Sequence, residues 1–258
     1  MFGAEKPLIG VIHLPPLPGY DESPGIDRVI EKALFDLRAL ESGPFEAALV
    51  ENEEDKPHRV ESAPETTAVM TRVVRELVAA ATRCEIGVEI LLNDPEASLA
   101  VAHAAGATFI RTDYFVDPME RPEHGGPMRI DPDAVMAYRK KIGASGIRIL
   151  ADIQVKYARM VEERTLTRSA ELAAAKGADA VVVTGTVTGE PPRVEEVERA
   201  QAGAGVIPVL IGSGLERSNA TELLRVADGA IVGTSLKRGA HIDATKVQEL
   251  LIERRLCG

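Results

Sequence analysis

The sequence predicts a (β/α)8 barrel, the TIM-barrel fold class, that forms a single domain over residues 1–258. Short apolar segments alternate with amphipathic segments along the whole chain, as expected of a parallel sheet whose strands are buried on both faces. The chain has 258 residues, close to the length of about 250 that is typical of this fold. Two small-residue turns, at 212–214 and 233–235, follow the last two apolar segments. Barrels of this class often bind phosphate there.

Eight apolar segments are predicted to form the strands, and eight strands close such a barrel. They are residues 8–13, 47–51, 86–92, 109–111, 148–152, 180–184, 209–212 and 230–232. In this fold the active site lies at the carboxyl ends of the strands. Polar residues at those ends are therefore the first candidates for function.

Helices are predicted between the strands because apolar residues recur there at three- and four-residue spacing. The predicted helices are residues 27–40, 65–82, 95–105, 132–142, 167–175, 194–202, 220–226 and 244–256. Asp94-Pro95 and Asp131-Pro132 each combine a capping side chain with a proline, which predicts two helix starts.

Three connections are longer than plain turns, at residues 13–25, 52–64 and 113–131. All three follow strands, so they are expected at the catalytic end of the barrel. The third is predicted to be a lid without secondary structure of its own.

Composition restricts the classes of function. The formal net charge of −10 argues against nucleic-acid binding. The two cysteines, Cys84 and Cys257, have no metal-like spacing, which suggests a reducing compartment. The first residues show no signal-peptide pattern and no segment is apolar enough for a membrane span. We therefore expect a cytoplasmic protein.

Polar residues lie at the end of each of the first four predicted strands. His13 ends the first and is a candidate general base or acid, the alternative being a histidine that bonds loop backbone. Glu51 is a catalytic candidate and Asn52 a substrate ligand, unless both belong to a solvated loop. Asn93 is expected to contact substrate. Arg111 either clamps an anionic group of the ligand or forms a structural salt bridge.

The fifth strand carries three polar residues at alternate positions, Asp152, Gln154 and Lys156. Alternation would place all three on one face, and an inward face at the barrel mouth suits them better than packing against helices. Asp152 and Lys156 are predicted to be catalytic and Gln154 to bind substrate. The alternative is a buried structural Asp–Lys pair.

Further small and hydroxyl residues are predicted to bind the ligand. Thr184, Gly185 and Thr188, after the sixth strand, are expected to offer donors to substrate. A phosphate cup is predicted from glycines that allow close backbone approach and from N–H groups at a helix start. Its members are Gly212, Ser213, Gly214, Gly233, Thr234 and Ser235.

No cofactor is predicted. Glu51, Asp113 and Asp152 could hold a divalent cation such as Mg²⁺, but no ligand spacing in the sequence requires one.

The chain resembles the BtpA family, which includes SgcQ-like members, over nearly its whole length. The resemblance rests on Ile9-Gly-Val-Ile-His13-Leu-Pro-Pro-Leu-Pro-Gly19, Glu51-Asn52 with Asp55 and Pro57, Asn93-Asp94, Phe109-Ile-Arg111, Ala151-Asp152 with Val155-Lys156, Val183-Thr184-Gly185 with Thr188-Gly189, Gly212-Ser213-Gly214 and Gly233-Thr234-Ser235-Leu-Lys237. It implies a phosphate-binding barrel. The family takes its name from a cyanobacterial protein needed for photosystem I accumulation, and many members are labelled phosphoribosylanthranilate isomerase-like.

The chain departs from the family pattern at four positions. The family often has asparagine at Glu89, arginine at Leu92, and histidines at Gln154 and Tyr157. Losing those histidines implies a changed substrate or lost activity near the fifth strand.

Two classes of function remain open. The first is an enzyme of isomerase or lyase type that acts on a phosphorylated sugar or nucleoside-like molecule, with the phosphate in the cup. The second is a non-catalytic assembly factor on the same scaffold, since fold does not imply function. A homo-oligomer is compatible with both.

Overall fold

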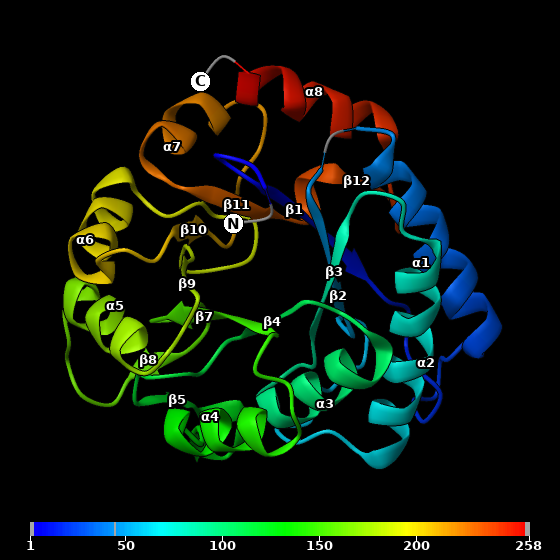
Figure 1. Ribbon diagram of the computed structural model, residues 1–258, viewed down its shortest axis with the longest axis horizontal. Helices are drawn as coiled ribbons and strands as arrows, with labels where there is room; N and C mark the ends of the chain where they lie inside the picture. Colours follow the sequence, from blue (N-terminus) through cyan, green and yellow to red (C-terminus); the bar gives the residue numbers. More distant parts are fainter. Residues whose placement is uncertain (1–2, 44, 256–258) are drawn as a thin grey trace.

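The barrel is closed and parallel, with strand order β1-β11-β10-β9-β7-β4-β3-β2, so the predicted fold class is confirmed (Figure 1). The structure is a computed structural model; it describes residues 3–43 and 45–255, of which 251–255 by backbone only. The barrel strands are β1 Leu8–His13, β2 Ala47–Glu51, β3 Glu85–Glu89, β4 Phe109–Thr112, β7 Arg148–Ile153, β9 Ala180–Val183, β10 Val209–Ile211 and β11 Gly229–Val232.

The helices surround the barrel on its outside (Figure 1). They are α1 Ile26–Glu41, α2 Pro64–Ala80, α3 Pro95–Ala105, α4 Pro132–Lys141, α5 Leu166–Ala175, α6 Val194–Ala204, α7 Ala220–Val226 and α8 Ala244–Arg255. Each agrees with a predicted helix to within a few residues; residue 256, the predicted end of the last one, lies outside the described residues, as does Cys257. Among the described helices, none is long and apolar enough to cross a membrane.

Both predicted helix starts are confirmed by their caps. The Asp94 carboxylate accepts the N–H of Ala97 at 2.9 Å, and the Asp131 carboxylate accepts the N–H of Ala134 at the same distance. Each cap satisfies an N–H that the first helical turn leaves without a partner.

Alternation along the strands sends every second side chain into the barrel, where two layers form. The lower layer is apolar and consists of Ile9, Val11, Ala47, Leu49, Phe109, Leu150, Ala180, Val182, Leu210 and Ile231. The upper layer, one position nearer the carboxyl ends, consists of His13, Glu51, Glu89, Arg111 and Asp152. This register places a row of buried ionisable groups directly above the apolar core.

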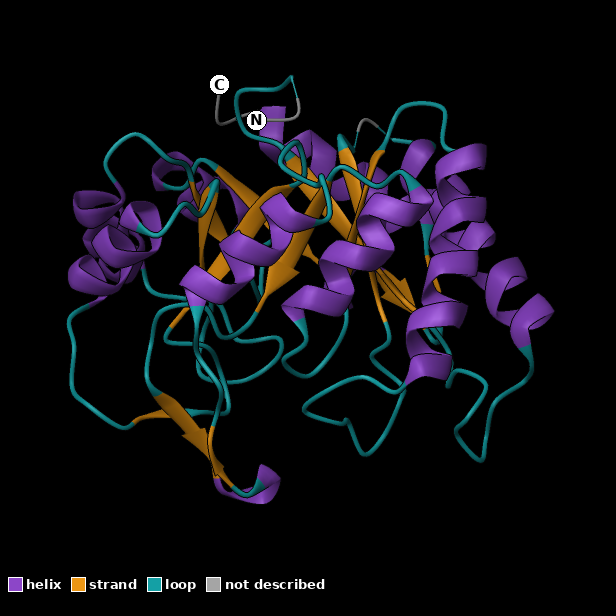
Figure 2. Ribbon diagram, turned by 60° about the horizontal axis from the view of Figure 1, so that its bottom comes forward, coloured by secondary structure: helices purple, strands orange, loops and turns teal. Residues whose placement is uncertain are grey.

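The lid prediction was wrong in one respect, because residues 113–131 carry their own secondary structure. They contain β5 Met119–Arg121, the 3-10 helix η1 Pro122–His124 and β6 Gly126–Pro127. These strands join β8 Arg159–Met160, from the β7–α5 connection, in a sheet of order β6-β5-β8. The small sheet projects from one end of the barrel (Figure 2).

The predicted strand 86–92 ends early, at Glu89. Leu92 is buried not in the barrel wall but against Tyr114, Met119 and Val155, beside the small sheet. Leu92 is therefore apolar because it packs against loop residues, and the periodicity of a strand could not predict this contact. A last hairpin, β12 Lys237–Arg238 and β13 His241–Ile242, follows the 3-10 helix η2 Thr234–Leu236.

Candidate active site

A cavity of about 460 Å³ lies at the carboxyl ends of the barrel strands. Many residues predicted to form the site line it: His13, Glu51, Arg111, Lys156, Thr188, Gly212, Ser213, Gly214, Gly233, Thr234 and Ser235. Asp113, considered above as a cation ligand, also lines it, together with polar side chains for which no role was predicted: Glu53, His58, Glu89, Arg121 and Tyr157. The cavity thus combines an ionisable floor with a rim of loop residues.

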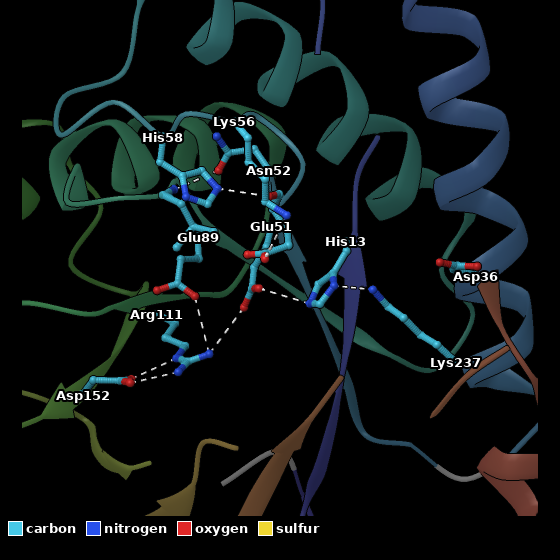
Figure 3. A network of polar contacts seen from close by, with 12 residues as sticks. His13, Asp36, Glu51, Asn52, Lys56, His58, Glu89, Arg111, Asp152 and Lys237 are labelled. Carbon is cyan, nitrogen blue, oxygen red and sulfur yellow. Dashed lines mark hydrogen bonds and ion pairs between the residues drawn. The ribbon is translucent and has the colours of Figure 1, made fainter. Parts of the chain in front are cut away.

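Arg111 is the centre of that floor and is only 4% exposed. Its Nε and Nη2 donate to the two carboxylate oxygens of Asp152 at 2.9 and 2.8 Å (Figure 3). Its Nη1 lies 3.4 Å from Glu51 Oε1 and 3.6 Å from Glu89 Oε2. With three carboxyl groups around its guanidinium, Arg111 forms the predicted salt bridge. Its contact with an anionic group of a ligand stays a prediction.

Burial and charge split the pKa values of two neighbouring carboxyl groups. Burial raises the pKa of Glu89 well above its usual value, although Arg111 opposes the shift. Burial also acts to raise the pKa of Glu51, but His13, in its protonated form at acid pH, and Arg111 outweigh it and the pKa is lowered. Glu89 therefore keeps its proton to higher pH than Glu51 does, an arrangement found where one carboxyl group acts as an acid and the other as a base.

His13 makes contacts through both ring nitrogens. Its Nε2 lies 3.5 Å from Glu51 Oε2, and its Nδ1 contacts the Lys237 ammonium (Figure 3). Burial lowers the pKa of His13 to about 4; Glu51 opposes this shift, while Lys237 and Lys32 add to it. The imidazole is therefore neutral at neutral pH.

Lys156 and Tyr157 lie at the rim of the cavity. No hydrogen bond or ion pair of the Lys156 ammonium is found within the described residues, which leaves this cation free to meet a ligand. Tyr157 has a left-handed backbone, φ 64°, and its hydroxyl accepts the N–H of Thr188 at 2.8 Å. The guanidinium of Arg121 lies over the Tyr157 ring, 5.7 Å from its centre. These contacts join the small sheet to the β9–α6 loop.

The two glycine-rich turns face the cavity. Within the described part of the chain, the N–H groups of Ser213, Gly214, Thr234 and Ser235 have no hydrogen-bond acceptor. Gly214 has φ 69°, and a Cβ there would lie 2.2 Å from the Pro191 nitrogen, so only glycine fits.

Asp152, predicted to be catalytic, is not among the residues that line the cavity. It is 1% exposed, and both of its oxygens accept from Arg111, which it holds in place. The predicted inward row 152–156 was wrong, because β7 ends at Ile153 and Gln154 has φ 47°. The Gln154 amide turns away and donates to the Arg164 carbonyl and the Ser169 hydroxyl.

Four further predicted substrate ligands lie outside the cavity lining and bond to the protein instead. The Asn52 amide accepts the N–H of Leu91 and donates to Asp55. Asn93 donates to the Arg129 carbonyl, because β3 ends before it and the chain turns away. Thr184 Oγ1 accepts the N–H of Lys156, and Gly185 donates its N–H to Ser213 Oγ. These residues shape the loops that carry the site.

The described residues contain no group of three His, Cys, Asp or Glu side chains arranged to hold a metal ion. Of the residues considered for a cation, Glu51 and Asp152 face the Arg111 guanidinium instead of one another.

Glu89 and Lys237 were not predicted to be site residues. Glu89 had a visible signal, a carboxyl group inside an apolar strand, and Lys237 ends the motif that begins at Gly233. Arg121 and His58 gave no signal, because they reach the cavity through loop folding alone.

Comparisons with known proteins agree with this architecture. A protein of Archaeoglobus fulgidus described as uncharacterized is 38% identical over 96% of this chain and 98% of its own length. The photosystem I biogenesis protein BtpA of Synechocystis is 35% identical over 94% of this chain and 84% of its own length. The putative sgc region protein SgcQ of Escherichia coli is 29% identical over 97% and 95%.

Solved structures share the fold at low sequence identity. N-(5'-phosphoribosyl)anthranilate isomerase from Pyrococcus furiosus covers 97% of this chain and 99% of its own, with a TM-score of 0.60 and 13% identity. Thiamine phosphate pyrophosphorylase from the same organism covers 98% and 97%, with a TM-score of 0.61 and 17% identity. The model of the BtpA family matches residues 4–254. The chain therefore belongs to the BtpA family.

Proposed function

We propose that this protein is an enzyme that acts on a phosphorylated small molecule, such as a sugar or nucleoside-like phosphate, by proton transfer of isomerase or lyase type. One observation carries the proposal. The same cavity is lined by the glycine-rich turns and by a buried acid–base cluster, which consists of Glu51, Glu89 and Arg111.

The turns suit the phosphate. Ser213, Gly214, Thr234 and Ser235 offer N–H groups that have no acceptor within the described residues. Gly212 and Gly233 add no side chain over the floor; a Cβ at Gly233 would lie 3.4 Å from His13 Nε2. A phosphate held there gains hydrogen bonds without displacing others, and its binding energy fixes the reacting end of the molecule. Two proteins of the same fold, described above, are named for phosphate-containing compounds, which supports this class of ligand.

The cluster suits proton transfer. Glu51, with its lowered pKa, serves as the general base, and Glu89, with its raised pKa, serves as the acid. Lys156, without a protein partner at its ammonium within the described residues, stabilises negative charge that develops on the substrate. Arg111 and Asp152 keep both carboxyl groups in place.

Binding is tested by thermal unfolding with a panel of sugar phosphates, nucleotides and free phosphate, with and without Mg²⁺. A ligand at about a hundred times its Kd adds roughly 2.7 kcal/mol. Gly233→Asp places a carboxylate in the cup and should abolish the shift, whereas Gly146→Asp, at an exposed site with open space, should keep it. Absence of a shift with every phosphorylated compound, or an undiminished shift in Gly233→Asp, contradicts the proposal.

Chemistry is tested by incubating the stabilising ligand in D2O and following exchange of its carbon-bound hydrogens by NMR. Glu51→Gln should slow the exchange about 10²–10⁴-fold, the usual contribution of a general base. Exchange that is equally fast in Glu51→Gln would assign the base elsewhere.

An assembly function is the second candidate, because a relative that matches 94% of this chain is named a photosystem I biogenesis protein. It is favoured if no phosphorylated compound stabilises the protein and if a stable complex with a partner protein survives Glu51→Gln and Lys156→Ala.

A further inference from the structure

Lys237 is a partly buried lysine next to His13, and the proposed chemistry gives it no role. It begins β12, directly after η2 and the second glycine-rich turn. Pairing with Ile242 across the hairpin and the hydrogen bond from Lys246 Nζ to its carbonyl, at 2.7 Å, fix its backbone. From this position its ammonium reaches His13 Nδ1 (Figure 3).

This contact restricts the imidazole of His13. A lysine ammonium carries three hydrogen-bond donors and no acceptor. Nδ1 must therefore present its lone pair to Lys237, and the single proton of the neutral ring must be on Nε2. Nε2 is the nitrogen that lies 3.5 Å from Glu51 Oε2 and close to the Gly233 turn.

The charges around His13 support the neutral ring. Glu51 and Glu54 are the acidic groups that act on it, and Lys237 and Lys32 are the basic ones. Lys32 donates to the His13 carbonyl oxygen and pairs with Asp36 at 2.6 Å. A second proton on Nδ1 would point at the Lys237 ammonium and repel it, in agreement with the pKa of about 4 for His13.

We infer that Lys237 is a positioning residue that holds His13 as the Nε2–H tautomer, so that His13 is a hydrogen-bond donor and not a proton acceptor at this site. The consequence for substrate rests on the proposed function. A neutral imidazole N–H beside the phosphate turns stabilises a carbonyl or enolate oxygen of the ligand while Glu51 takes the proton. The general-base role predicted for His13 from the sequence would then pass to Glu51.

The tautomer is measured directly on ¹⁵N-histidine-labelled protein without ligand, using long-range ¹H–¹⁵N correlation spectra over a pH titration. The five histidines are separated by assigning His13 as the signal lost in His13→Gln. Wild type is compared with Lys237→Met, with Lys237→Arg, which keeps a cationic donor, and with Lys140→Met, the same change at an exposed site on α4. Circular dichroism confirms that each variant is folded.

The expected result for the wild type is a proton on Nε2 at pH 7 and a titration midpoint near 4. In Lys237→Met the midpoint should rise by about one pH unit or more, and the Nδ1–H tautomer should appear. Lys237→Arg and Lys140→Met should resemble the wild type. A wild-type proton on Nδ1, or an unchanged tautomer and midpoint in Lys237→Met, overturns the inference. Failure of every phosphorylated compound to stabilise the protein would instead defeat the proposed function and leave the tautomer result standing.

Discussion

The lower and upper layers of the barrel interior both consist of inward-facing side chains of the barrel strands, but the side chains differ completely in chemistry. Val11 and Leu49 of the lower layer lie one inward position below His13 and Glu51 of the upper layer. The lower layer is buried throughout. In the upper layer three carboxyl groups and a guanidinium are buried, and the His13 imidazole is partly exposed. Of these two layers, only the upper one, at the mouth of the barrel, carries charge.

The difference shows how the fold separates stability from function. Burying apolar side chains stabilises the lower layer without any need for partners. Burying charges is costly unless they are paired, so the upper layer depends on Arg111 to compensate Asp152 and Glu51. Groups held in this way have shifted pKa values, and such groups concentrate at functional sites.

Removing the charge at the centre of the upper layer should have the largest effect. Arg111→Met leaves three buried carboxyl groups without their cation and should lower the free energy of unfolding by about 3–5 kcal/mol at pH 8. Without the cation their folded pKa values rise above the unfolded ones, so stability is retained at low pH and lost as pH increases. Urea unfolding at pH 5 and pH 8 measures this. Arg28→Met, at an exposed ion pair, should cost less than about 1 kcal/mol.

Overfilling the lower layer should have a smaller effect that does not depend on pH. A Cβ at Gly87 would lie 2.2 Å from the ring of Phe109. Gly87→Ala should therefore lower the free energy of unfolding by about 1–3 kcal/mol. Urea unfolding should give the same loss at pH 5 and pH 8, because no ionisable group is involved. Gly146→Ala, which has open space, is the matched control; a loss for Gly87→Ala that changes with pH would contradict the separation of the layers.

Replacing Glu89 should change the free energy of unfolding by still less, and the change reports whether this carboxyl group of the upper layer is protonated. Because the folded pKa of Glu89 is raised, its contribution to stability is complete below the unfolded pKa and is lost as pH rises through the folded one. Glu89→Gln mimics the protonated form at every pH. The variant should thus gain stability relative to the wild type between pH 5 and pH 8, by on the order of 1 kcal/mol. Equal pH dependence in the two proteins, measured by urea unfolding, would show that Glu89 is ionised.

The sequence could predict the barrel because the signals for it are local. Apolar strands such as β1 and β2 matched residue for residue, since both of their faces are buried and their ends are polar. Asp94 and Asp131 cap helices through hydrogen bonds to residues only three positions away. Interactions between residues so close in the sequence can be predicted from the sequence itself.

The candidate site was predicted where it depends on strand ends and missed where it depends on loops. His13, Glu51 and Arg111 were predicted from their places at strand ends, and all three line the cavity. Gln154 did not, because the chain leaves the strand after Ile153 and the Asp117 carboxylate binds the Gln154 N–H at 2.8 Å. A contact between residues 37 positions apart has no counterpart in local periodicity.

The smallest effect is expected at the rim, where loops meet above the upper layer. Tyr157 is half exposed and its hydroxyl binds the N–H of Thr188 at 2.8 Å. Tyr157→Phe removes one hydrogen bond at a site that water can reach, so the free energy of unfolding should fall by less than about 1 kcal/mol. The local effect is sharper: amide hydrogen exchange at Thr188 should become faster, while exchange in the lower-layer strands stays unchanged. Unchanged exchange at Thr188 would mean that the backbone hydrogen bond from the Tyr157 N–H to the Thr186 carbonyl, 3.2 Å long, and not the hydroxyl, holds the two loops together.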